Sequence, residues 1–164
     1  MAGSSWRPTT GDAVTAKVLA MRTWTATTTT AARPEAVLDV LTDPEAAARW
    51  APLPFDVEDL DGRRLATGSR ARVSGSLAGK RVGFDLEVHE ASDRGLSLAA
   101  NGPVGFDVDY QLAPVAGGSE VRASVSVRPS GGIAGRLLAQ ATAALLSAGA
   151  LEAALARVTR EAAI

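Results

Sequence analysis

Cysteine is absent from the 164-residue chain, and histidine occurs only once. The lack of cysteine excludes disulfide bonds, thiolate nucleophiles and cysteine-bound metal. A single histidine excludes catalytic and zinc sites that are built on several imidazoles. We therefore expect no metal site and no cofactor, and we assign no catalytic residue.

A charge excess of either sign is also missing, because 18 acidic residues balance 17 basic ones and the formal net charge is -1. Such a balance provides no overall field that would attract nucleic acid or anionic lipid. We expect no nucleic-acid partner. The chain is long enough for one good core and too short for two ordinary domains, so a single domain is expected.

The N-terminal segment lacks the features of a secretory signal. Residues 1–20 are rich in Gly, Ser and Thr, and they contain no basic start followed by an apolar run. We expect this segment to be a disordered tail and the protein to be cytoplasmic. Met21 stands directly before the first predicted strand, so starts of translation at Met1 and at Met21 are both open.

The C-terminal stretch from Gly132 to Ala162 predicts a single long helix around which the fold is organised. Its apolar side chains recur every three or four residues, which is the spacing of one helical face. They are Ile133, Leu137, Ala141, Ala144, Ala148, Leu151, Leu155 and Val158. Only 15 uncharged residues separate Arg136 from Glu152, and a membrane span needs about 20 apolar ones. We therefore expect no membrane span.

The chain before this helix begins with a strand and two short helices. The stretch Arg22 to Thr30 is rich in threonine, which suits a pleated strand. Pro34 opens a helix at the position that proline favours. Asp43 caps a second helix that begins at Pro44 and ends at Trp50. The predicted order is therefore strand, helix, helix.

Five further segments alternate between apolar and polar residues, which indicates strands with one buried face. They are Arg70–Leu77, Arg81–His89, Leu96–Ala100, Val104–Leu112 and Val121–Arg128. Short connections join them, so they predict an antiparallel meander. The apolar face of this meander and that of the C-terminal helix would cover each other, which predicts an α+β fold.

This order of elements resembles the helix-grip fold of the START-like (SRPBCC) superfamily, in particular its bacterial polyketide cyclase/dehydrase-like members. The local features that carry it are the segment Pro34 to Pro44, the following Ala48-Arg49-Trp50, and Gly131-Gly132 before the last helix. The resemblance covers about Met21 to Ala162, and we place the single domain at 21–164. It implies an antiparallel sheet of about six to seven strands wrapped on the long helix, with a cavity for a hydrophobic small molecule.

The residues expected to bind that molecule come from the inward strand positions, the end of the second short helix and the long helix. They are Trp50, Phe55, Phe84, Leu86, Leu98, Phe106, Val108, Tyr110, Leu137, Ala141, Ala144 and Ala148. Tyr110 is the one inward residue with a titratable group. Its hydroxyl would either pair at the sheet edge or orient a ligand carbonyl or hydroxyl group. Trp50 would either gate the cavity mouth or plug it.

The charged residues of the strands fall on the opposite, outward face. By alternation His89 lies there near Glu87 as a surface histidine. Asp107 and the neighbouring Asp109 point outward too, and cross-strand ion pairs with Arg122 or Arg128 are expected. These groups are therefore not expected to carry out chemistry in the cavity.

Three functions are compatible with this pattern. The first is a non-catalytic carrier or sensor that encloses a hydrophobic small molecule, because the inner face has one hydroxyl and no acid–base pair. An alternative is a polyketide-type cyclase or dehydratase, in which cavity shape and Tyr110 would position the substrate. A second alternative is a protein-interaction module whose protein partner binds the outer face at Arg70 and Arg72.

Overall fold

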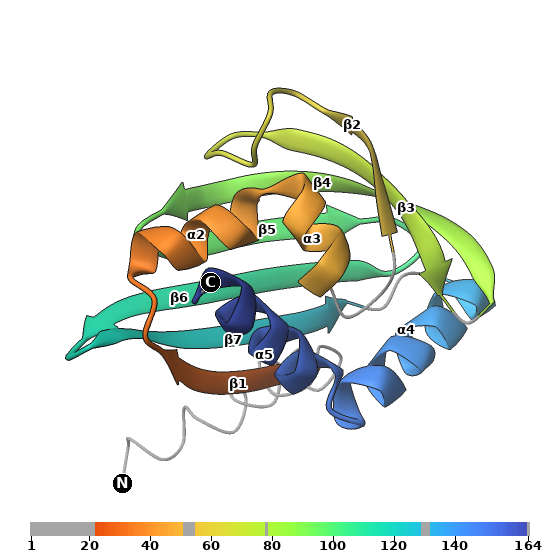
Figure 1. Ribbon diagram of the computed structural model, residues 1–164. Coiled ribbons are helices and arrows are strands. Elements are labelled where there is room, and N and C mark those ends of the chain that lie inside the picture. The colour runs from red at the N-terminus through yellow and green to blue at the C-terminus, as the bar shows by residue number, and fades with distance from the viewer. Residues whose placement is uncertain (1–21, 51–54, 78, 129–131, 164) are drawn as a thin grey trace, which may run out of the picture.

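The computed structural model describes residues 22–50, 55–77, 79–128 and 132–163, without the side chains of Ala48 and Leu77. Figure 1 shows their arrangement. In chain order the elements are β1 Arg22–Thr30, α2 Pro34–Thr42, α3 Pro44–Trp50, β2 Phe55–Leu60, β3 Arg70–Leu77, β4 Lys80–Ser92, β5 Gly95–Asn101, β6 Gly105–Val115, β7 Gly118–Arg128, α4 Gly132–Ser147 and α5 Ala150–Ala162. The expected tail at residues 1–20 lies outside the described residues, as do Met1 and Met21.

The strands form one sheet with the order β1-β7-β6-β5-β4-β3-β2, and every neighbouring pair is antiparallel. Strands β3 to β7 are the predicted meander, and β1 extends it by pairing with β7. The alternation pattern did not reveal β2. Most residues of this strand are exposed, and its pairing with β3 shifts register between Val57 and Asp59. β1 and β2 are therefore the two edges of an open sheet.

Local signals place the short helices where the sequence predicts them. Pro34 and Pro44 are the first residues of α2 and α3. The Asp43 side chain accepts a hydrogen bond from the backbone N–H of Glu45 at 3.0 Å, so the predicted cap is confirmed. Figure 1 shows α2, α3 and α5 together on the inner face of the curved sheet.

Helix α5 provides the grip on that inner face. Its buried residues are spaced by three and four positions, as one helical face requires. They are Leu151, Ala154, Leu155 and Val158. The helix packs against β1 and β7 of the sheet and against α2 and α3. The α+β helix-grip fold predicted from the sequence is thus confirmed.

The prediction of a single continuous C-terminal helix is wrong. Helix α4 ends at Ser147, α5 begins at Ala150, and the two are bent by 60° relative to each other. Gly149 lies between them with a φ of +100°, in the left-handed region where glycine pays no Cβ penalty. The residues of α4 that would continue the buried face of α5 in an unbroken helix therefore do not lie on that face.

Helix α4 consequently presents a different row to the rest of the protein. Leu138, Ala143 and Leu146 are buried, whereas Ile133 and Leu137 are 78% and 59% exposed. The helix carries alanine and leucine on several sides, so its periodicity alone does not select the buried face. Only the tertiary position of α4 makes that selection.

Candidate ligand-binding cavity

A cavity of about 210 Å³ lies between the inner face of the sheet and the helices. The strands β3 to β7 contribute its floor, α3 and β2 contribute one side, and the junction of α4 with α5 contributes another. The cavity is partly open. Val57 on β2 and Leu145 on α4 line it and are also 37% and 41% exposed, so both lie at its rim.

The sheet residues predicted for the site are all found at the cavity. Alternation along the strands turns their side chains toward the helices. These residues are Phe55, Phe84, Leu86, Leu98, Phe106 and Val108. Several of them, such as Leu98 and Val108, are only partly buried, whereas Val88 and Val121 on the same sheet are fully packed. The inner face thus has a packed part and a part that faces the cavity.

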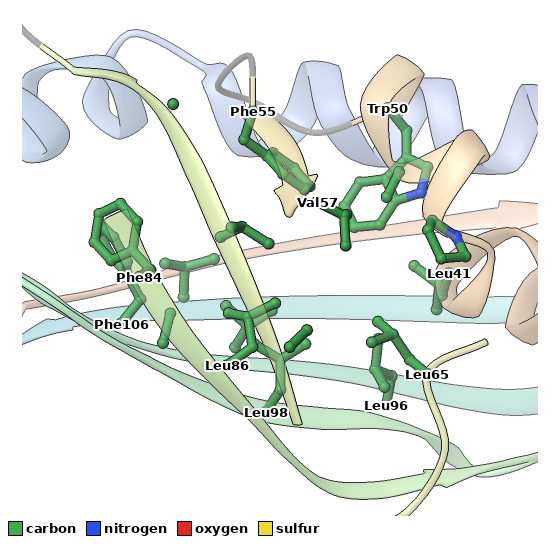
Figure 2. Close-up of a pocket in the computed structure, with 18 of the residues that line it drawn as sticks. Leu41, Trp50, Phe55, Val57, Leu65, Phe84, Leu86, Leu96, Leu98 and Phe106 are labelled. Atoms are coloured by element: carbon green, nitrogen blue, oxygen red, sulfur yellow. The ribbon is translucent and has the colours of Figure 1, made fainter. Parts of the chain in front are cut away.

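The two ends of the cavity carry different aromatic groups. Figure 2 shows Phe84 and Phe106 together at one end, with Trp50, Leu41 and Leu96 at the other. The Phe84 and Phe106 rings lie 5.4 Å apart between centroids in a tilted arrangement. One end is therefore formed by two rings that carry no polar group.

Trp50 forms the opposite end and is held by contacts on several sides. Its indole N–H donates to the carbonyl of Val40 at 3.2 Å, and its own carbonyl accepts from the Arg157 guanidinium at 3.2 Å. Its ring meets that of Tyr110 edge to face, with centroids 5.8 Å apart. Of the two roles expected for Trp50, these contacts favour closing the cavity end over gating it.

Tyr110 lines the cavity beside Trp50 and is only 2% exposed. Within the described residues its hydroxyl has no hydrogen-bond partner, so the predicted partner at the sheet edge is not found there. No fully buried side-chain oxygen of the described residues lacks a partner, so this hydroxyl keeps some free surface, and the cavity lies next to it. Burial raises the pKa of the Tyr110 hydroxyl well above its usual range.

The four residues predicted from the long helix do not line the cavity. Ala144, Ala148 and Leu137 are exposed on α4 and the turn that follows it, and Ala141 is only partly buried. These residues were predicted on the assumption that one helix continues through Gly149 with the same buried face, but the helix breaks there. Because the break changes the phase, this row points away from the sheet.

A neighbouring row of α4 takes their place. Thr142, Leu145 and Leu146 line the cavity, followed by Ala150 and Leu151 at the start of α5. Thr142 is a polar residue within an apolar run, yet it is buried. Its hydroxyl donates to the carbonyl of Leu138 at 2.9 Å, which satisfies the group inside the helix. Because a threonine in a helix can bond the carbonyl four residues earlier, it can be buried without another hydrogen-bond partner.

The charged outer face carries ion pairs, as expected for Asp107, whereas Asp109 accepts a hydrogen bond from Gln111 at 3.1 Å instead of pairing with an arginine of the described residues. Asp107 accepts from Arg128 at 2.9 Å, and His89 lies 3.8 Å from Glu87 with both side chains about half exposed. Arg72 likewise pairs with a neighbouring carboxylate, that of Asp85, at 2.9 Å. These groups lie on the opposite side of the sheet from the cavity.

The placement of acidic side chains and the length of the apolar helices in the described residues bear on metal and membrane binding. No group of three or more His, Asp or Glu side chains is arranged there to hold a metal ion. No single helix within the described ranges is long and apolar enough to cross a membrane. Helices α4 and α5 reach that length and apolar character only when they are counted together, and they are bent by 60° relative to each other.

Comparisons with known proteins agree with this architecture. Residues 21–163 match the family model described as polyketide cyclase/dehydrase and lipid transport. No curated protein sequence matches the chain.

Several solved structures share the fold. The Zhui aromatase/cyclase from Streptomyces sp. R1128 has a TM-score of 0.65 and 20% identity, over 87% of this chain and 93% of that one. Protein TTHA0849 from Thermus thermophilus has a TM-score of 0.64 and 20% identity, over 86% and 97% of the two chains. Ara h 8.0201 has a TM-score of 0.55 and 14% identity, over 84% and 97%. At these identities the likeness concerns the fold alone.

Proposed function

Because this chain belongs to the START-like polyketide cyclase/dehydrase and lipid transport family, we propose that it binds a hydrophobic small molecule in the cavity between sheet and helices. We further propose that it acts as a carrier or sensor and not as a catalyst. The observation that carries the proposal is the apolar cavity itself, whose lining includes Leu86, Leu98 and Phe106 as side chains left partly uncovered by the fold.

Apolar surface that faces a cavity favours an apolar occupant. A ligand that covers Leu98 and Val108 removes their remaining surface from water, at a gain of about 25 cal/mol per Å². The cavity of about 210 Å³ is more than ten times the volume that one water molecule needs. Ligand pockets of proteins are typically concave and mostly apolar, with few polar groups, and this cavity has those properties.

The lining supports binding better than it supports catalysis. An acid–base mechanism needs a group whose pKa lies near neutrality within reach of the substrate. Among the described residues around the cavity, Tyr110 alone carries a titratable side chain, and burial moves its pKa upward, away from neutrality. The cyclase or dehydratase alternative would therefore rely on positioning alone.

The proposal is tested with the neutral fluorescent probe N-phenyl-1-naphthylamine. We expect the wild-type protein to bind the probe, and Val108→Trp, which places an indole on the cavity floor, to bind it at least tenfold more weakly. Ala144→Trp adds the same side chain at an exposed position of α4 and should bind like the wild type. Near-ultraviolet circular dichroism confirms that both variants are folded. Absence of wild-type binding, or equal binding by Val108→Trp, would contradict the proposal.

The non-catalytic role is tested with the natural ligand. Mass spectrometry of an organic extract from protein purified out of its native host identifies a copurifying molecule, and Val108→Trp should lack it. The purified molecule is then incubated with fresh wild-type protein. We expect it to be recovered unchanged. Conversion by the wild type that falls about tenfold or more in Tyr110→Phe would instead support the cyclase or dehydratase alternative.

A further inference from the structure

The polar groups inside the cavity differ in whether they are already paired. Three partly or fully buried lining residues carry a polar side-chain atom in the described part of the chain. The indole N–H of Trp50 donates to the Val40 carbonyl, and the hydroxyl of Thr142 donates to the Leu138 carbonyl. The Tyr110 hydroxyl has no such partner among the described residues. Among the buried lining residues, one hydrogen-bonding group is therefore available to an occupant, while the hydroxyl of Ser76, which also lines the cavity, is exposed to solvent.

This hydroxyl can serve as a donor and as an acceptor. A phenol carries one proton and two lone pairs, and burial keeps that of Tyr110 protonated because its pKa is raised. A polar group left without a partner in an apolar site is unfavourable, and a ligand oxygen that accepts its proton removes that penalty. The hydroxyl thus favours ligands that bring an oxygen to this point.

The position of Tyr110 gives the cavity a direction. Its ring contacts Trp50 at one end, and it pairs with Leu96 across the sheet. Phe106 lies four residues earlier on β6, beside Phe84 at the other end, so about 13 Å of strand separates the two ends. Figure 2 shows these ends, marked by Trp50 and by the Phe84–Phe106 pair, on opposite sides of the cavity. The end near Trp50 offers the Tyr110 hydroxyl, whereas the buried side chains at the other end are apolar and the one hydroxyl near them, that of Ser76, is exposed to solvent.

We propose that the cavity binds a neutral, largely apolar molecule with one carbonyl or hydroxyl oxygen, and that Tyr110 hydrogen-bonds this oxygen at the Trp50 end. This inference rests on the proposed function and names the ligand class of the same cavity. The apolar remainder of the ligand extends toward Phe84 and Phe106. A carboxylate or phosphate is excluded, because no cationic side chain of the described residues lines the cavity and a buried charge without a partner is strongly unfavourable.

The test uses three probes with one carbon skeleton, which are 9-fluorenone, fluorene and fluorene-9-carboxylate. Dissociation constants are measured by quenching of tryptophan fluorescence in the wild type and in Tyr110→Phe. We expect the substitution to weaken 9-fluorenone by about three- to tenfold, the contribution of one hydrogen bond, and to leave fluorene unchanged or tighter. The carboxylate should bind the wild type at least tenfold more weakly than the ketone.

Thr142→Val is the matched control, because it removes the other buried hydroxyl of the cavity, one that already donates to Leu138. The preference for 9-fluorenone over fluorene should survive in this variant. If Tyr110→Phe changes the affinities of ketone and hydrocarbon equally, or if the carboxylate binds as tightly as the ketone, the inference is overturned while the proposed function stands. If neither N-phenyl-1-naphthylamine nor any of the three probes binds the wild type, both are overturned.

Discussion

The two C-terminal helices differ in what their apolar side chains contact. Helix α5 buries Leu151, Leu155 and Val158 almost completely, and it packs against both the sheet and the short helices. Helix α4 buries Leu138 and Leu146 but leaves Ile133 and Leu137 largely exposed. Helix α5 therefore belongs to the core, whereas α4 borders the cavity and contributes to its rim. The same fold thus assigns stability to one helix and access for a ligand to the other.

The largest expected effect separates these two roles. Leu155→Asp should lower the free energy of unfolding by about 4 kcal/mol or more, because it loses a burial worth about 1.5–3 kcal/mol and adds an unpaired charge to the core. Leu137→Asp makes the same chemical change on α4 and should stay within about 0.5 kcal/mol of the wild type. Urea denaturation measures both. Equal losses for the two variants would show that α4 is packed like α5.

A second prediction concerns Gly149. Whether alanine at this position lowers or raises the free energy of unfolding distinguishes a broken helix from a continuous one. At a φ of +100° an alanine is strained, although its Cβ would meet no atom closer than 4.0 Å. Gly149→Ala should therefore destabilise by about 1 kcal/mol, and Gly149→Asn by less, because asparagine tolerates this conformation better. Thermal and urea unfolding provide the values. Stabilisation by alanine is the result that a continuous helix would give.

A third, smaller effect is a change of stability at alkaline pH. It tests whether Tyr110, which lies where the packed part of the sheet meets the cavity, is buried. Tyr110 is the single tyrosine of the chain, so tyrosinate absorbance reports on it alone. Its raised pKa means that above pH 10 the unfolded state holds fewer protons than the folded state. The free energy of unfolding should therefore fall as the pH rises beyond about 10, and this component should vanish in Tyr110→Phe. Tyrosinate formation near pH 10 in a folded protein would place the hydroxyl in water instead.

The strands and the short helices could be predicted because their signals are local. Alternation located β3 to β7 and turned Phe84, Leu98 and Val108 toward the cavity, while Pro34 and Pro44 marked the helix starts. Strand β2 escaped prediction because its residues are mostly exposed and a register shift interrupts it.

The helical side of the site could not be predicted from periodicity. Ala144 and Ala148 share a face with Leu151 only if the helix continues through Gly149. A glycine inside an apolar run is compatible with either course, since its cost within a helix is only about 1 kcal/mol relative to alanine. The break depends on how α5 packs against the sheet and the short helices. Those contacts involve residues that are distant in sequence, so the local sequence pattern does not predict them.

The most direct test of the account is amide hydrogen exchange of the wild-type protein with and without saturating N-phenyl-1-naphthylamine. Binding in the cavity should slow exchange in α3 and in the part of α4 from Leu138 to Ser147, because these segments border the ligand. The part of α5 beyond Leu151 belongs to the core and does not line the cavity, so its exchange should slow only by the amount that binding raises the free energy of global unfolding. Protection confined to that part of α5, or no protection in α3 and α4, would contradict the account.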